Sequence, residues 1–226
     1  MAEEKDQPIL DVQEAYGKTE QYIIENSKSL SIIAGAIVLL VGGYFAWKYL
    51  YVADLEESAK KEMFKAEQYF EQDSLNLAVN GNGQQKGFLA IADEYGVTPT
   101  GNLAQYYAGI CFLKTGEYEK AIEHLGEFSS KDEMVGPLAT GAIGDAHMEL
   151  GHTDEAVSYY LKAAEQSKNN FTSPIYLKKA AMAYEEKGEY DNAVKVYERI
   201  KNDFTETSEA RDMDKYIARA KDMGGT

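Results

Sequence analysis

Apolar positions along this chain follow two different patterns. From Leu30 to Trp47 the chain carries no charged residue, and the apolar segment extends to residue 52. A helix over residues 30–52 is about 35 Å long at about 1.5 Å per residue, enough to cross the hydrocarbon core of a bilayer. Tyrosine and tryptophan gather at its C-terminal end, where such rings favour the headgroup layer. We therefore expect a single N-terminal transmembrane helix over residues 30–52, preceded by a short tail over residues 1–29.

Two other interpretations of this segment compete with a membrane anchor. A buried core helix rarely contains so long a charge-free run. A cleaved signal peptide has a short basic leader and a small-residue cleavage site, whereas this leader is long and acidic. An uncleaved anchor is favoured, but charge leaves its orientation open. Lysines lie on both sides of the segment, with slightly more after it: Lys18 and Lys28 before, and Lys48, Lys60, Lys61 and Lys65 after.

After residue 52 the apolar residues recur every three or four positions, as on one face of an α-helix. The first such stripe comprises Leu55, Ala59, Met63, Ala66 and Phe70. Asn80–Gly83 interrupts the pattern, a shorter helix is expected from Gln85 to Tyr95, and Thr98–Gly101 forms a second break. Residues 53–101 are therefore predicted to form a helical linker or a divergent first repeat.

The sequence then repeats itself over residues 102–205. Three similar blocks each begin with a turn glycine and follow a helix-length apolar pattern: GEYEKAIEHL at Gly116–Leu125, GHTDEAVSYY at Gly151–Tyr160 and GEYDNAVKVY at Gly188–Tyr197. Their shared alanines, Ala121, Ala156 and Ala193, are 35 and 37 residues apart. A period near 34 residues with paired helices is the signature of tetratricopeptide repeats. We expect an all-α fold in which three such repeats form a solenoid.

Small residues at fixed positions support this register. Twelve residues before each shared alanine stand Gly109, Gly144 and Ala181. Small side chains at these points allow the two helices of a repeat to approach closely. A last amphipathic segment, within residues 206–226, is predicted to be a C-terminal capping helix, because a repeat array needs an end with a polar outer face.

Composition narrows the possible functions. The chain has 38 acidic and 23 basic residues, a formal net charge of −15, which argues against a protein that binds nucleic-acid phosphates. Its single cysteine, Cys111, excludes a disulfide framework within the chain. His124, His147 and His152 lack metal-ligand spacing, and His147 is expected to be structural. We therefore expect no enzymatic activity, no cofactor and no metal site.

Protein binding is the function that repeat arrays of this kind usually serve. Their stacked helix pairs create a concave surface lined by the first helix of each repeat. In this register the residues predicted to face a protein or peptide partner are Leu103, Tyr106, Ile110, Leu113, Leu138, Asp145, Met148, Ile175, Lys178 and Met182. This surface is mostly apolar and contains two flexible methionines. In the alternative, the C-terminal helix folds into the groove and buries these side chains as core.

The order of these parts resembles one bacterial family. The tail ends in Glu25-Asn26-Ser27-Lys28-Ser29-Leu30, a glycine-bearing apolar segment follows with Tyr44, Trp47 and Tyr49 at its exit, and an acidic repeat domain comes next. Over roughly residues 14 to 205 the chain is similar to the ancillary subunit of the SecYEG translocon (YfgM-like). The Glu-Asn-x-Lys entry to the apolar segment is the more specific feature, because the repeats alone are generic.

This resemblance implies a single-pass protein of the bacterial inner membrane, with a cytoplasmic N-terminus and periplasmic repeats. It also implies three kinds of partner: the SecYEG translocon, a membrane-anchored periplasmic chaperone of the prolyl-isomerase type (PpiD-like), and emerging secretory proteins. The expected role is a scaffold that holds a weak binding surface beside the membrane. The alternative is a membrane-tethered receptor or assembly scaffold whose repeats face the cytosol.

Overall fold

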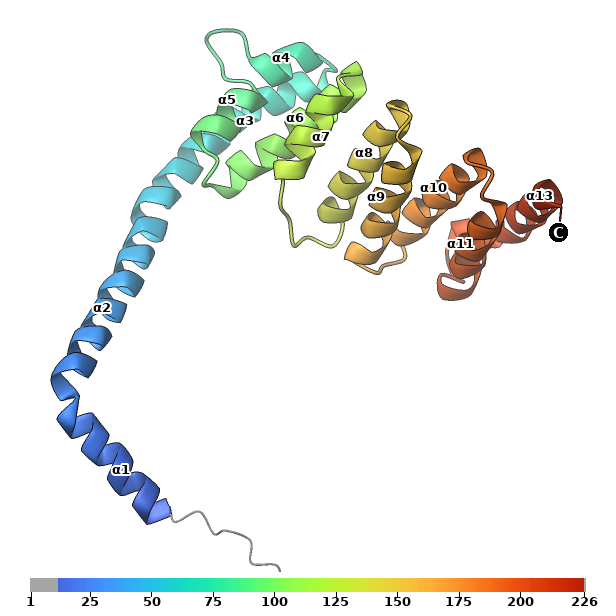
Figure 1. Cartoon of the computed structure of the whole chain (residues 1–226). Helices are drawn as coiled ribbons and strands as arrows, with labels where there is room; N and C mark the ends of the chain where they lie inside the picture. Colours follow the sequence, from blue (N-terminus) through green and yellow to red (C-terminus); the bar gives the residue numbers. More distant parts are fainter. Residues whose placement is uncertain (1–11, 226) are drawn as a thin grey trace, which may run out of the picture. The chain divides into compact units, whose positions relative to one another are not determined.

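The computed structural model describes residues 12–225, which form helices, turns and loops without a β-strand among them (Figure 1). The chain divides into two units, one that ends at Ala53 and one that begins at Asp54. Part of the predicted N-terminal tail, residues 1–11, lies outside the described residues.

The first unit consists of consecutive helices. They are α1 (Val12–Glu25), α2 (Ser27–Ala46) and a π-helical stretch, η1 (Trp47–Val52). Helix α2 contains no buried residue, and Leu39 in its middle is 77% exposed. The helical stretch Ser27–Glu71 includes a window with a mean hydropathy of 2.1, so by length and composition it qualifies as a candidate membrane span. The predicted segment 30–52 lies within this stretch, and its transmembrane role stays a prediction.

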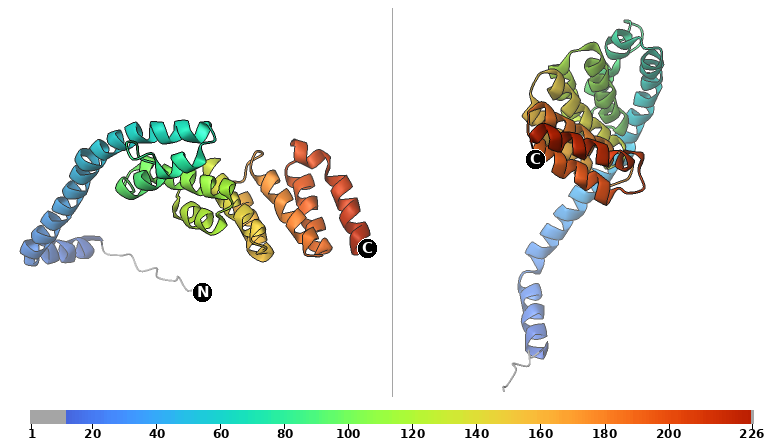
Figure 2. Two further views of the ribbon diagram at one scale, coloured as in Figure 1. Left: turned by 90° about the horizontal axis from the view of Figure 1, so that it is seen from above. Right: turned by 90° about the vertical axis from the view of Figure 1, so that its right-hand side faces the viewer.

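The second unit is a succession of helix pairs, which follow one another from α3 to α13 in Figure 2. Its first part contains α3 (Ala53–Glu71), α4 (Leu75–Asn80) and α5 (Phe88–Glu94). Three helix hairpins come next: α6 (Pro99–Thr115) with α7 (Tyr118–Glu127), α8 (Val135–Glu149) with α9 (Thr153–Gln166), and α10 (Ser173–Glu186) with α11 (Tyr190–Asp203). The unit ends with α12 (Ser208–Arg211) and α13 (Met213–Gly224).

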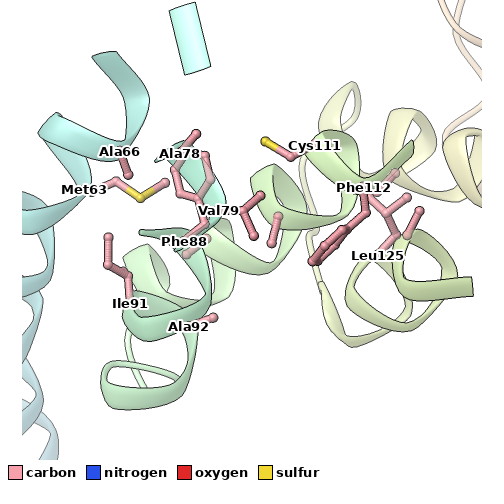
Figure 3. Packing of buried hydrophobic residues seen from close by; sticks show 14 of the residues in the cluster. Met63, Ala66, Ala78, Val79, Phe88, Ile91, Ala92, Cys111, Phe112 and Leu125 are labelled. Carbon is pink, nitrogen blue, oxygen red and sulfur yellow. The ribbon is translucent and has the colours of Figure 1, made fainter. Parts of the chain in front are cut away.

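The stripe predicted on α3 forms part of the core. Ala59, Met63 and Ala66 are buried, in one cluster with Phe88 and Ile91 of α5 (Figure 3). Helix α5 is shorter than the helix predicted from Gln85 to Tyr95, and it begins only after Gly87. A Cβ atom on Gly87 would collide with the carbonyl of Val79, so the chain passes here too closely for a side chain.

The predicted break at Thr98–Gly101 is instead the first turn of α6. Thr98 caps this helix, because its hydroxyl oxygen accepts a hydrogen bond from the Gly101 amide at 3.0 Å. Pro99 fits at the first helical position, where no amide hydrogen is needed. Glu56 of α3 adds a second cap, since its carboxylate accepts hydrogen bonds from the amide (3.0 Å) and the hydroxyl (2.8 Å) of Thr100.

The close approach predicted within each repeat is present in the structure. A Cβ atom on Gly109 of α6 would lie 2.5 Å from Cγ of Leu125 on α7, and one on Gly144 of α8 would lie 2.7 Å from Cδ1 of Tyr160 on α9. Ala181, the third member of the set, is fully buried on α10. The first helix of each repeat then ends at a glycine with a positive φ angle, Gly116 (81°), Gly151 (74°) or Gly188 (74°).

The C-terminal segment packs on α11, the last helix of the repeats. Met213 and Ala220 of α13 are fully buried, and the Tyr216 ring lies 5.4 Å from the Tyr197 ring of α11. A bend at Asp212 divides this segment into α12 and α13, whereas the sequence pattern predicts one helix. The outer face of α13 is exposed, as a capping helix requires.

We predict that filling the space between paired helices destabilises the repeats. Gly144→Val places two methyl groups against the Tyr160 ring, and we expect it to lower the free energy of unfolding by about 1–3 kcal/mol. Gly126 of α7 is the matched control, because no atom lies within 4 Å of its Cβ position. Gly126→Ala should stabilise the helix by about 0.5–1 kcal/mol. Urea denaturation followed by circular dichroism measures both changes, and equal stability of the two variants would contradict this packing.

We also predict a loss of stability in mild acid that depends on His147 of α8. Its ring is stacked on Tyr159 at 5.2 Å, its Nδ1 is buried without a hydrogen-bond partner, and burial lowers its pKa. The unfolded chain therefore binds a proton more readily than the folded one. The neutral His147 ring contributes fully to the free energy of unfolding above pH 6.5, which is about the pKa of histidine in the unfolded chain. This contribution is lost as the pH falls through the lower pKa of His147 in the folded chain.

The measurement is the melting temperature at pH 7.5 and at pH 5. The His147→Phe variant keeps an aromatic ring against Tyr159 and should lose less stability on acidification than the unsubstituted chain. His124→Gln is the matched control and should retain the full loss, since it leaves His147 in place. If the melting temperature of His147→Phe falls as much on acidification as that of the unsubstituted chain, the pH dependence belongs to other groups.

Candidate functional site

The ten residues predicted to face a partner lie on the first helices of the three repeats, α6, α8 and α10. We call the surface that they form the first-helix face. Its four residues on α6 are half-buried and pack against the core cluster: Leu103, Tyr106, Ile110 and Leu113. Three of the four apolar residues in the next two repeats are more open, because Leu138 is 39%, Ile175 44% and Met182 49% exposed, whereas Met148 is half-buried. These three residues are the accessible part of the face.

A pocket of about 400 Å³ lies between the first and third repeats and contains three of the ten predicted residues. We call it the Asp145 pocket. Its lining residues come from five helices: Leu113, Tyr118, Asp145, Met148, Glu149, Tyr160 and Lys179. Leu113, Asp145 and Met148 were predicted from the repeat register. The other four were not. Tyr118 and Tyr160 project from the second helices, and Glu149 and Lys179 each follow a predicted residue by one position.

Asp145 is held from two sides. The Tyr160 hydroxyl donates a hydrogen bond to Oδ1 of Asp145 at 2.7 Å, and Lys179 Nζ lies 2.7 and 2.8 Å from its two carboxylate oxygens. Burial and the neighbouring Asp145 charge both raise the pKa of Tyr160, so its hydroxyl remains protonated and acts as a donor. These contacts join α8, α9 and α10, and they neutralise the Asp145 charge with that of Lys179.

Lys178, one of the ten predicted residues, also contacts the capping helix. It is half-buried, and its Nζ lies 4.7 Å from the centre of the Tyr216 ring on α13. Helix α13 otherwise packs on α11. Leu138, Ile175 and Met182 remain exposed, so α13 does not bury them as core residues.

Four exposed apolar side chains occur at the N-terminal ends of α8 and α10. We call them the apolar patch: Met134, Leu138, Phe171 and Ile175. The Tyr176 hydroxyl donates a hydrogen bond to the Leu138 carbonyl oxygen at 3.5 Å, which joins α10 to α8 near these residues. Asn169 holds the turn before α10, since its carboxamide oxygen accepts hydrogen bonds from two following amides and its nitrogen donates to the Glu133 carbonyl at 3.2 Å.

Metal-binding groups and the single thiol are the remaining candidates for chemistry in residues 12–225. That part of the chain contains no group of three or more histidine, cysteine, aspartate or glutamate side chains placed to hold a metal ion. Cys111 is fully buried on α6, and burial raises the pKa of its thiol to about 12. A thiol with this pKa is a poor nucleophile at neutral pH.

Comparisons with known proteins support the repeat register. Tetratricopeptide repeat family models match residues 103–132 and 142–207. Tetratricopeptide repeat protein 29 of Macaca fascicularis is 33% identical over 98 residues, which make up 40% of this chain. The matched stretch is 21% of that protein, so the chain spans about a fifth of the length of this relative.

Solved structures resemble the fold over a larger share of the chain. Two crystal structures of nearly identical TPR-like repeats from Podosopora anserina, in a protein described as a kinesin light chain, each give a TM-score of 0.57 at 17% identity. Each match covers 75% of this chain and 88% of the other. The solved structures show an all-α, solenoid-like fold, and the family models and the macaque relative show that residues 103–132 and 142–207 are similar to tetratricopeptide repeats.

Proposed function

We propose that the chain is a membrane-anchored scaffold that binds proteins through the first-helix face of its repeats, in the manner of the ancillary SecYEG translocon subunit that it resembles. The observation that carries this proposal is the accessible part of that face. The apolar patch lies exposed beside a pocket of about 400 Å³, on a fold whose members generally bind protein partners. The chain acts as a binding protein and not as an enzyme.

Membrane anchoring is supported by the surface of α2. Leu39 and most of the other large apolar side chains of this helix are about half exposed or more. In water, that much contiguous apolar surface promotes association, whereas lipid tails cover it without further protein contacts. The aromatic rings of Trp47 and Tyr49 then lie at the level of the headgroups, and Lys48 reaches the same layer.

The proposed location is the bacterial inner membrane, with α1 on the cytoplasmic side and the repeats in the periplasm. The proposed partners are the SecYEG translocon, a PpiD-like periplasmic chaperone and emerging secretory chains. Anchoring confines the repeats to a thin layer beside the membrane. A weak binding surface then acts at a high effective concentration where translocated chains emerge.

A second candidate function is a receptor whose repeats face the cytosol. The lysine distribution favours it, because Lys48, Lys60, Lys61 and Lys65 follow the charge-free run Leu30–Trp47, whereas Lys18 and Lys28 precede it. The first-helix face then captures targeting segments or organises an assembly machine on the cytosolic surface.

Affinity purification in mild detergent tests the binding surface. The Leu138→Asp, Met182→Asp double variant adds two charges to exposed positions, so we expect an intact fold and at least a tenfold loss of partner recovery. Met223→Asp is the matched control, because Met223 is also exposed but lies on α13, and it should retain the partners. Translocon or chaperone subunits among the recovered proteins would support the proposed location. Equal recovery with both variants would remove the first-helix face from the proposal.

Cysteine labelling distinguishes the two orientations. In a Cys111→Ala background, Asn170→Cys places a thiol at an exposed position of the repeats, and Gln21→Cys places one on α1. We expect a membrane-impermeant maleimide to label the Asn170→Cys variant in intact spheroplasts and the Gln21→Cys variant only after lysis. The reverse pattern would establish the cytosolic receptor, and release of an unanchored, shortened chain would contradict both.

A further inference from the structure

The face of α8 that contributes to the first-helix face changes from apolar to acidic along its length. Leu138, Ala142, Asp145 and Glu149 follow one another at intervals of four, three and four residues, so they form one stripe on the helix. Leu138 belongs to the apolar patch, and Asp145 and Glu149 line the Asp145 pocket. Between them, Gly141 and Ala142 are buried, and the Tyr176 ring of α10 packs against Gly141.

The two carboxylates of this stripe are in different electrostatic states. Asp145 is paired with Lys179, and their charges cancel. Within residues 12–225, Glu149 has one polar partner, the Tyr118 hydroxyl at 3.3 Å, and no cation. The Asp145 pocket therefore carries one uncompensated negative charge, in a chain whose formal net charge is −15.

The walls of the pocket suit a long cationic side chain. Leu113 and Met148 offer apolar contact to the aliphatic stem of an arginine or a lysine, and the Glu149 carboxylate, which accepts a hydrogen bond from the Tyr118 hydroxyl, belongs to the same lining. The cavity of about 400 Å³ is within the usual range of about 300–1,000 Å³ for pockets that accept small ligands. An acidic side chain would meet an unpaired like charge here.

The distance between the two ends of the stripe sets the spacing of the ligand. Leu138 and Glu149 are eleven residues apart on α8, about 16 Å at about 1.5 Å per residue. An extended peptide covers this distance in about five residues at about 3.3 Å each.

We propose that the first-helix face recognises extended peptide segments with two features: an arginine or lysine that pairs with Glu149, and bulky apolar residues about five positions away that cover the apolar patch. This inference rests on the proposed protein-binding function and defines the sequence class that it selects. Such segments occur in unfolded chains, where positive and apolar residues are both exposed.

Fluorescence anisotropy with the full-length chain in detergent micelles tests this inference. The probe is a labelled Gly/Ser peptide that carries one arginine and a Leu-Phe pair at this spacing, made in both orders. We expect saturable binding of at least one order. Replacing the arginine by norleucine, replacing Leu-Phe by Ser-Ser, and the variant Glu149→Gln should each weaken it about tenfold, the loss expected for one charge-assisted contact or one buried anchor.

Charge exchange provides the sharpest control. Glu149→Lys should lose the arginine peptide and gain affinity for a peptide with glutamate at that position. Glu123→Gln on α7 removes one exposed carboxylate outside the pocket and should leave the affinity unchanged. Circular dichroism checks that each variant is folded, and Glu149 is exposed, so its substitution is expected to be tolerated.

The outcomes separate this inference from the proposed function. The inference is overturned if neither peptide order shows saturable binding, or if Glu149→Gln leaves the affinity unchanged. If partners still purify with Glu149→Gln but are lost with Leu138→Asp, Met182→Asp, the proposed function stands and the specificity assigned to Glu149 fails. If no partner purifies with the unsubstituted chain, the proposed function itself fails, whatever the peptide measurement shows.

Discussion

The close contact between the two helices of each repeat is the constraint on which the rest of the structure depends. Gly109 and Gly144 leave space for Leu125 and Tyr160, so that the paired helices pack with these larger side chains buried between them. That packing determines which side of α8 is buried and which side faces outward. It also brings the Tyr160 hydroxyl to Asp145, and both residues line the pocket. The contact that stabilises the repeat therefore also forms part of the pocket wall.

The repeat architecture could be predicted because it depends on spacing. Ala121, Ala156 and Ala193 recur at a nearly constant interval, and small residues precede them at a fixed distance. The boundaries were predicted less well, since they depend on contacts between distant residues. Pro99 and Gly101 look like a break in the sequence, yet Glu56, more than forty positions earlier, caps the helix that begins there.

The candidate site could be predicted only in part, for a related reason. The register identifies the positions on the first helix of each repeat, and Asp145 and Met148 among them line one pocket. It contains no information about side chains that arrive from neighbouring helices, such as Tyr118 and Lys179. It also could not assign Lys178 to the Tyr216 ring, because the path of the capping helix is set by packing on α11.

The burial of Cys111 has a consequence for where such a fold can work. It is the only thiol of the chain, it is enclosed by the core, and its raised pKa keeps it in the unreactive form. Thiol oxidation and disulfide exchange therefore find no accessible cysteine on the folded protein. The same covalent structure is stable in an oxidising envelope and in a reducing cytosol, so the redox environment places no demand on this architecture.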